Sequence, residues 1–331
     1  MRTVWVCLTI TSLAALALTG CPMRQAPVGT GGAPPAKTDV APEAAEEPAV
    51  ALPAGCSVSS DNEAQPGEAG YRIVHDESGI EFVWAPAGSF TMGAGKEELN
   101  ALWKEWGPAY NSVPHEGGEE DQESFWRETA NTEAPAHEVE LDGFWIARTE
   151  VTIGQWREAM GSVPRQEYVD KAEHPVTSIT YADCEAFCDK LGFALPTEAQ
   201  WEYAARGAEN LQYPWGNDWD AGRCQCYVGG HEYQYSAPAG HMKDDLSWCG
   251  ALDMAGNVRE WCKDWFSKTF YASAEATQKS PECTEAGETR VIRGGDYESE
   301  ALDCRGAARH FESPDSGYYL YGLRPVIEAV P

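Results

Sequence analysis

The residues with the clearest chemical potential lie between Gly250 and Phe266. This stretch, GALDMAGNVREWCKDWF, contains a turn at Ala255-Gly256-Asn257 and two carboxylates, Asp253 and Glu260. Glycine and asparagine both adopt positive φ at low cost, so the pair predicts a backbone reversal. Because such a turn brings carboxylates and backbone carbonyls together, the stretch is of the kind that binds a hard cation such as calcium.

Cysteine thiols are the second chemically active group. The chain has eleven cysteines, and nine of them follow residue 21. In an oxidising compartment most should pair, and an odd number leaves at least one thiol free or paired with another molecule. Cys184 and Cys188 share one face of a predicted helix, where a mutual disulfide is geometrically unfavourable. Cys224 and Cys226 are too close in sequence to bridge without strain, and no connectivity follows from the residues alone.

Ordinary catalytic motifs are absent from the sequence. There is no zinc-like histidine spacing, no Gly-x-Ser-x-Gly elbow, no P-loop and no Gly-x-Gly-x-x-Gly. We interpret the scattered histidines, including His137 and His310, as structural. Carboxylate pairs are common by chance in a chain with a net charge of −29, so they do not indicate acid–base catalysis. The same charge excludes binding to nucleic acid and electrostatic attachment to anionic lipid.

Residues 1–21 have the features of a bacterial lipoprotein signal. A positive start at Arg2 and a mostly apolar run precede Leu18-Thr19-Gly20-Cys21, which resembles a lipobox. The apolar run is too short for a convincing membrane span. We expect Cys21 to carry a lipid that anchors the mature chain in the cell envelope, on the periplasmic or the outer surface. The alternative is an ordinary signal peptide with an incidental Cys21.

The rest of the chain is predicted to be a tether and one domain. Residues 22–70 are expected to be a disordered tether, because the part up to about residue 55 is dense in Pro, Ala, Gly and Glu and lacks aromatic residues. Residues 71–331 are expected to form a single domain, long enough to bury a core.

The elements that position the chemical groups are predicted to be short. Residues 82–93 indicate two strands around a Pro-Ala-Gly turn, and the alternation over 137–142 indicates a half-buried strand. Residues 258–265 suit either a short buried helix or an irregular buried strand. Three helices are expected to begin at capping threonines, which are Thr152, Thr180 and Thr197. These elements, with many Gly and Pro residues, indicate an α+β fold rich in irregular structure.

Several motifs occur together in a specific order. They are Gly88-Ser89-Phe90-Thr91-Met92-Gly93, Glu150-Val151-Thr152, Leu195-Pro196-Thr197-Glu198-Ala199-Gln200-Trp201-Glu202-Tyr203-Ala204-Ala205-Arg206-Gly207, Tyr213-Pro214-Trp215-Gly216, Asp253-Met254-Ala255-Gly256-Asn257-Val258 and Arg293-Gly294-Gly295. In order and spacing they resemble the sulfatase-modifying factor, or formylglycine-generating enzyme, family. The resemblance runs from about residue 82 to residue 326.

The resemblance implies both a fold and an activity. The implied fold is a single domain related to C-type lectins, with little regular secondary structure and often with bound calcium. Active members of the family oxidise a sulfatase cysteine to formylglycine, using oxygen and a copper(I) ion. Two cysteine thiolates hold that ion, because soft thiolates suit copper(I).

The chain departs from the family where copper would bind. After Gly295 it has Asp296 at the position of a family serine and Ser299 at the position of the first cysteine. Cys304 takes the position of the second cysteine by simple counting, or a core position if a few residues are deleted. Either way the thiolate pair is missing, and a hydroxyl does not replace a thiolate toward copper(I). We therefore do not expect copper.

Other family positions are also changed. Arg259 stands where active members carry a tryptophan. Arg309 is retained, and it can serve either the site or a structural ion pair. A family disulfide is lost at both of its positions, Ala205 and Gly306.

For calcium, the resemblance implies a specific ligand set. It consists of the carboxylates of Asp253 and Glu260 and the backbone carbonyls of Gly256 and Val258. The alternative is that Asn257 only turns the chain while Glu260 pairs with an arginine.

The sequence thus predicts a lipid-anchored, exported protein whose domain is not catalytic and binds an unknown partner protein or ligand through its loops. One alternative is a diverged copper-dependent oxidase that uses Cys304, alone or with a cysteine brought near by folding. Another is a lectin-like carbohydrate binder in which Tyr318, Tyr319 and Tyr321 stack on sugars. A surface covering of the core explains those tyrosines equally well.

Overall fold

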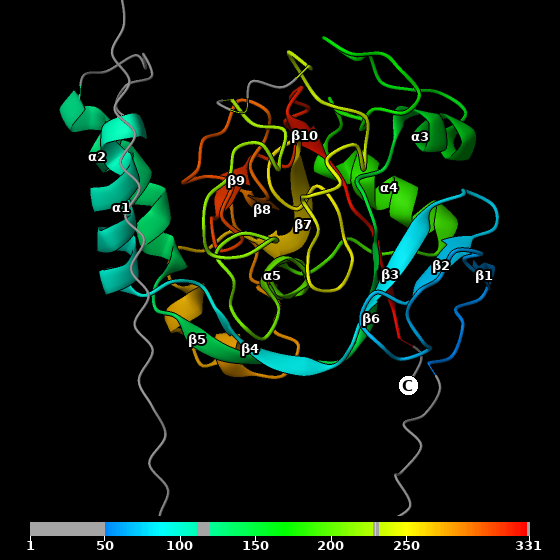
Figure 1. Ribbon diagram of the computed structural model, residues 1–331, viewed down its shortest axis with the longest axis horizontal. Helices are drawn as coiled ribbons and strands as arrows, with labels where there is room; N and C mark the ends of the chain where they lie inside the picture. The colour runs from blue at the N-terminus through cyan, green and yellow to red at the C-terminus, as the bar shows by residue number, and fades with distance from the viewer. Residues whose placement is uncertain (1–49, 111–118, 228, 230–231, 330–331) are drawn as a thin grey trace, which may run out of the picture. The chain divides into compact units, whose positions relative to one another are not determined.

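The computed structural model describes residues 50–110, 119–227, 229 and 232–329 (Figure 1). The predicted signal, its lipobox Cys21 and the tether up to residue 49 lie outside these residues. Within the described part, no helix is both long and apolar enough to cross a membrane.

Short strands and helices alternate with long irregular connections (Figure 1). The strands are β1 (Cys56–Val58), β2 (Arg72–His75), β3 (Glu81–Ala85), β4 (Gly88–Met92), β5 (His137–Leu141), β6 (Phe144–Ala147), β7 (Arg259–Trp265), β8 (Arg290–Arg293), β9 (His310–Glu312), β10 (Tyr321–Gly322) and β11 (Val326–Glu328). The α-helices are α1 (Lys96–Tyr110), α2 (Glu119–Ala130), α3 (Ile153–Met160), α4 (Tyr181–Leu191) and α5 (Glu198–Arg206). Three 3-10 turns are η1 (Asn131–Glu133), η2 (Phe270–Ala272) and η3 (Glu275–Thr277).

The strands form three sheets. One has the order β1-β2-β3-β6-β11, a second has the order β10-β7-β8-β9, and β4 pairs with β5 alone. In the first sheet, β11 pairs with β6 and lies at the edge opposite to β1. The second sheet presents the turn between β8 and β9, which carries the candidate site.

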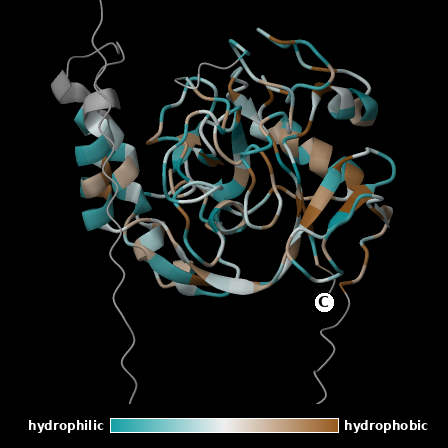
Figure 2. Cartoon of the chain, in the orientation of Figure 1, coloured by the Kyte–Doolittle hydropathy of each residue, from teal (hydrophilic) through white to brown (hydrophobic). Residues whose placement is uncertain are grey.

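Apolar side chains fill the space between the sheets and helices. Phe82, Phe144 and Trp145 of the first sheet are fully buried, and β3 is largely brown in Figure 2. Trp201 of α5 and Trp261 of β7 are fully buried as well. Large aromatic side chains of this kind supply most of the apolar area that a core removes from water.

The three predicted helices are present with their caps. In α3, α4 and α5 the threonine hydroxyl accepts from a backbone N–H in the first turn, and the side chain of that residue accepts from the threonine N–H. Gly161 and Gly192 end α3 and α4 with positive φ. The strands predicted in residues 82–93 and 137–142 are confirmed as β3, β4 and β5.

The tether prediction for residues 22–70 extends too far. Within that range, β1 pairs antiparallel with β2, so the folded part begins before Tyr71. Most of β1 is exposed, and Asn62 hydrogen-bonds to the backbone of Arg72 nearby. Backbone pairing with a sheet edge orders this segment, and Val50, Cys56 and Ala64 pack against the core.

The stretch for which helix and strand were both open is the strand β7. Its register with β8 shifts between Trp261 and Trp265, as in a β-bulge. A bulge interrupts the strict alternation of a strand, which explains why the apolar residues in this stretch also fit helical spacing.

Candidate functional site

The turn after β8 carries the residues at the family's copper-binding positions. Gly294 and Gly295 have φ of 100° and 70°, which lets the chain reverse there. The Ser299 hydroxyl donates to Oδ1 of Asp296 at 3.1 Å, and the Asp296 N–H donates to the Ser299 oxygen at 3.0 Å. The serine hydroxyl is therefore held by its own turn.

Arg259, the first residue of β7, fixes this turn further. Its Nε lies 2.8 Å from Oδ2 of Asp296, and its Nη2 donates to the Ser299 oxygen at 3.3 Å. The guanidinium thus neutralises Asp296 at the position where the resemblance implies a tryptophan. A hydroxyl held by a carboxylate and a guanidinium presents hard oxygen atoms rather than the soft sulfur that copper(I) prefers.

A pocket of about 250 Å³ opens at this turn. Its lining includes Arg259, Asp296, Ser299, Glu298 and Asp303, and α2 contributes further residues. None of the cysteines that the structure describes lines the pocket. The polar side chains that a ligand can meet in the pocket are therefore charged or hydrogen-bonding groups without sulfur.

Cys304 is fully buried and belongs to a separate thiol cluster. Its Sγ lies 3.2 Å from the point where a Cβ on Gly295 would be. Cys224 and Cys226 join it in one cluster, and the Cys224 thiol hydrogen-bonds to both of the others. The bond from Cys224, the largest single effect, lowers the pKa of Cys304, but burial together with the charges of Cys226, Asp303 and Asp296 raises that pKa to about 11. The Cys304 thiol is therefore protonated at neutral pH.

These positions do not fit the copper site that the resemblance implies. Ser299 lines the pocket without a sulfur, whereas Cys304 contacts other sulfurs away from the pocket lining. In the described part of the chain, neither Cys224 nor Cys304 forms a disulfide. In the same part of the chain, no three His, Cys, Asp or Glu side chains are arranged to hold a metal ion. Cys304 is fully buried, and which of the two family placements it takes stays a prediction.

Arg309 belongs to a buried ion-pair network. Its Nε and Nη2 each donate to the Glu198 carboxylate of α5 at 2.7 Å. Arg293 connects Glu198 to Glu202 in the same helix. Although Arg309 also lines the pocket, its charge is neutralised by Glu198, so it makes a structural ion pair.

The Glu260 carboxylate, a predicted calcium ligand, is bound by Arg324. Nε and Nη2 of Arg324 lie 2.7–3.0 Å from its two oxygens, and Trp201 Nε1 donates to Oε2 at 2.6 Å. With these donors on both oxygens, Glu260 does not fit a calcium ion. The arrangement is the alternative in which Glu260 pairs with an arginine.

Asp253, the other predicted carboxylate ligand, lies near two buried acids that the sequence did not identify as ligands. These acids are Glu150 and Asp245. When all three carboxyl groups are ionised, Oε2 of Glu150 and Oδ1 of Asp245 accept no hydrogen bond. Burial raises the pKa of each carboxyl, and the charge of Asp253 raises the pKa of Glu150 and Asp245 further. Calcium binding near Gly256 and Val258 stays a prediction.

Comparison with known proteins identifies the family of the chain. The profile of the family described as FGE-sulfatase, the sulfatase-modifying factor enzyme 1-like domain, matches residues 72–329. The chain belongs to this family. Among relatives, the formylglycine-generating enzyme of Streptomyces coelicolor is 36% identical over 194 residues, which are 55% of this chain and 60% of that enzyme. The serine/threonine-protein kinase Pkn1 of Chlamydia trachomatis is 32% identical over 217 residues, which are 58% of this chain and 34% of the kinase.

Both relatives extend well beyond the matched part, because this member of the sulfatase-modifying factor family spans 60% of one and 34% of the other. The structure of PvdO from Pseudomonas aeruginosa superposes with a TM-score of 0.62 at 23% identity, covering 80% of this chain and 100% of PvdO. Treponema denticola variable protein 1 follows with 0.57 at 20% identity, covering 75% and 95%. These likenesses show the fold and confirm the predicted single α+β domain of this family.

The family motifs identified the turn after β8 and the turn at Gly256, but not the residues from distant segments that pack around them. Cys224 and Cys304 are far apart in sequence and meet only through the fold. Glu150 stands in a family motif quoted above, yet its burial against Asp253 had no signal in the spacing. Asp245 lies outside the motifs, and only its burial marks it.

Proposed function

We propose that this member of the sulfatase-modifying factor family is an exported, lipid-anchored binding protein that does not oxidise sulfatase cysteines. The observation that carries the proposal is the hydroxyl of Ser299, held by Asp296 and Arg259 where active members have a copper-binding thiolate. Cys304, the remaining thiol of that region, is buried and protonated at neutral pH. A fold can keep its architecture while its site changes role.

The pocket supports binding of a partner protein or a small ligand. Its lining includes two ion pairs, Arg259 with Asp296 and Arg305 with Glu133, which hold these side chains in place. Positioned polar groups of this kind confer specificity on a binding site at a low ordering cost. The proposal therefore assigns recognition rather than chemistry to the pocket.

The oxidase assay tests this function. The reduced protein is incubated with copper(I), oxygen and a Cys-x-Pro-x-Arg peptide, and mass spectrometry measures conversion of the cysteine to an aldehyde. The formylglycine-generating enzyme of Streptomyces coelicolor serves as the positive control. We expect no aldehyde above the level without protein, and copper-dependent aldehyde formation would overturn the proposal.

A second candidate is the diverged oxidase. The contact of Cys304 with Cys224 and Cys226 favours it, because a second sulfur is present beside Cys304. This candidate requires the cluster to open to peptide and oxygen. It predicts an aldehyde yield that is lost in Cys224→Ser and kept in Cys184→Ser, whose thiol is buried elsewhere.

The anchor is supported by the lipobox and is tested separately. In the natural host, radiolabelled palmitate should be incorporated into the wild-type protein and not into Cys21→Ser. Cys7→Ser is the matched control and should incorporate label normally. Equal labelling of Cys21→Ser would contradict lipid attachment at Cys21.

A further inference from the structure

Five tyrosines from four separate segments form one cluster that reaches the surface and has Tyr297 buried beneath it, and we call this cluster the tyrosine patch. They are Tyr168, Tyr235, Tyr297, Tyr318 and Tyr319. Tyr168 stacks on Tyr235 with ring centroids 4.6 Å apart and meets Tyr319 edge-on at 4.8 Å. Tyr297 contacts Tyr235 and Tyr319 at 5.9 and 6.5 Å. Tyr168 and Tyr318 are the most exposed, at 47% and 43%.

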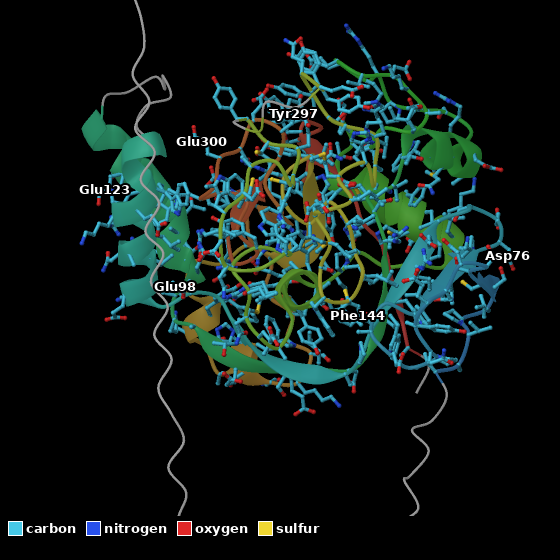
Figure 3. All side chains as sticks on the ribbon, viewed as in Figure 1. Asp76, Glu98, Glu123, Phe144, Tyr297 and Glu300 are labelled. Carbon is cyan, nitrogen blue, oxygen red and sulfur yellow. The ribbon has the colours of Figure 1, made fainter. Side chains whose placement is uncertain are left out.

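The patch adjoins the pocket through Glu298. This exposed carboxylate lines the pocket and accepts a hydrogen bond from the Tyr319 hydroxyl at 3.3 Å. Figure 3 labels Tyr297 and Glu300, which lie on either side of Glu298 in the sequence. Both are at the end of the domain where β9 and β10 lie. Aromatic faces and pocket carboxylates therefore meet at one edge.

The charges at this edge are not balanced. Each pocket arginine is already paired with a carboxylate: Arg259 with Asp296, Arg305 with Glu133 and Arg309 with Glu198. Within the described part of the chain, neither Glu298 nor Asp303 forms an ion pair with a lysine or arginine. Asp303 lies 3.9 Å from His310, and burial lowers the pKa of that histidine, so it is neutral at neutral pH. Arg259 and Arg305 also act on Asp303, but their own ion pairs are with Asp296 and Glu133.

Unbalanced carboxylates beside aromatic faces are the combination that stabilises an organic cation. We propose that the tyrosine patch and Glu298 bind a ligand that carries an organic ammonium group. The inference rests on the proposed binding function of the pocket and names the class of its ligand. The net charge of −29 further raises the local concentration of cations. A neutral sugar stacks on the same rings but has no charge to match Glu298.

A pair of probes with the same shape separates these ligands. Choline carries the ammonium group, and 3,3-dimethylbutan-1-ol replaces its nitrogen by carbon. Saturation-transfer NMR with the whole protein measures the binding of each probe through its methyl signal. We expect choline to bind roughly fivefold to tenfold more tightly, with a preference that shrinks as salt is added. Equal binding of the two probes overturns the inference.

Substitutions locate the site. Tyr168→Leu removes an exposed ring and Glu298→Gln removes the charge, and each should weaken choline binding about fivefold. Tyr168→Phe is the matched control, because it keeps the ring face, and it should bind choline within about twofold of the wild type. Both positions are exposed, so the thermal unfolding midpoint should not move. Unchanged choline binding in both Tyr168→Leu and Glu298→Gln overturns the assignment.

The aldehyde assay separates this inference from the proposed function. Aldehyde formation together with a choline preference refutes the non-catalytic proposal and leaves the cation site standing. No aldehyde and no choline preference refutes the cation site alone.

Discussion

Position 299 determines which atoms a ligand meets in the pocket. The Ser299 oxygen is held by Asp296 and Arg259, so the pocket offers oxygen and nitrogen donors. The only sulfur of the same turn, on Cys304, packs against Cys224 in the core. Ser299 and Cys304 are only five positions apart, yet Ser299 lines a pocket without sulfur and Cys304 belongs to a thiol cluster outside that pocket.

The buried acids around Asp253 make the stability of the protein depend on pH. Burial and neighbouring charge raise the pKa of Glu150, Asp245 and Asp253. A carboxyl with a raised folded-state pKa contributes stability that is fully present below its ordinary pKa of about 4 and is lost as pH rises through the raised value. In a chelator, the free energy of unfolding should therefore fall as pH rises from about 5 to 8.

Glu150→Gln tests this reading. The amide keeps an acceptor for the Asn257 side chain and supplies a donor toward Asp253, which hydrogen-bonds to Glu150. We expect the variant to lose on the order of 1–2 kcal/mol of this pH dependence and to exceed the wild type in stability at pH 8. Glu150→Ala, which keeps neither contact, should be destabilised throughout. Denaturant unfolding at several pH values measures all three proteins, and equal slopes in wild type and Glu150→Gln would refute the reading.

The same series tests calcium. If a cation occupies these oxygens, calcium raises the unfolding midpoint of the wild type at pH 8 and raises that of Glu150→Gln much less. An equal response in both proteins would place calcium elsewhere.

At the scale of elements, β7 is tied to two other segments through one ion pair. Glu260 of β7 binds Arg324, and the same guanidinium donates to the carbonyls of Ala147 in β6 and Leu252 before the turn. The ion pair therefore fixes the predicted calcium turn against both sheets. Its removal should be costly because Glu260 is left as an uncompensated buried charge.

A double-mutant cycle measures that cost. Arg324→Met should lower the free energy of unfolding by about 3–5 kcal/mol. Glu260→Gln keeps an acceptor for Trp201 and removes the charge. The double variant should therefore be more stable than Arg324→Met alone. If adding Glu260→Gln lowers the stability of Arg324→Met further, the buried charge is not what makes the single change costly.

The positions of the lost family disulfide, Ala205 in α5 and Gly306 after β8, allow a second test of how these segments pack. The Cβ of Ala205, in α5, lies 3.6 Å from the point where a Cβ on Gly306 would be, within the range for a disulfide. Ala205→Cys with Gly306→Cys should form a cross-link, although the Arg206 side chain must shift to make room. Mass spectrometry without reductant should find the bridge, and either single variant is the control. Two free thiols at these positions after oxidation would contradict the pairing.

Across the whole molecule, the sequence predicted what is encoded locally. The capping threonines and the alternation at residues 137–142 depend on near neighbours, and both predictions were correct. The family motifs also placed Asp296 and Ser299 in one turn. The resemblance paired positions 205 and 306 correctly, although they are far apart in the chain.

Long-range contacts were not accessible in this way. Three features join segments that are distant in the sequence: the contact between Cys224 and Cys304, the ion pair of Glu260 with Arg324, and the tyrosine patch. Residue spacing along the chain does not predict such contacts. The bulge in β7 is set by pairing with β8, so helix and strand could not be distinguished. The predicted tether extended too far toward the C-terminus. The segment of β1 is ordered by its pairing with β2, which its own composition does not indicate.

The most direct measurement of the central claim is the rate at which Cys304 is alkylated in the native, reduced protein. A buried thiol with a pKa of about 11 that lies outside the pocket should react with iodoacetamide only as fast as the protein unfolds. Glu298→Cys places a thiol at an exposed position of the pocket lining and serves as the control. We expect Cys304 to stay unmodified while the introduced thiol of the control variant reacts, and rapid alkylation of Cys304 in the folded wild type would contradict the account.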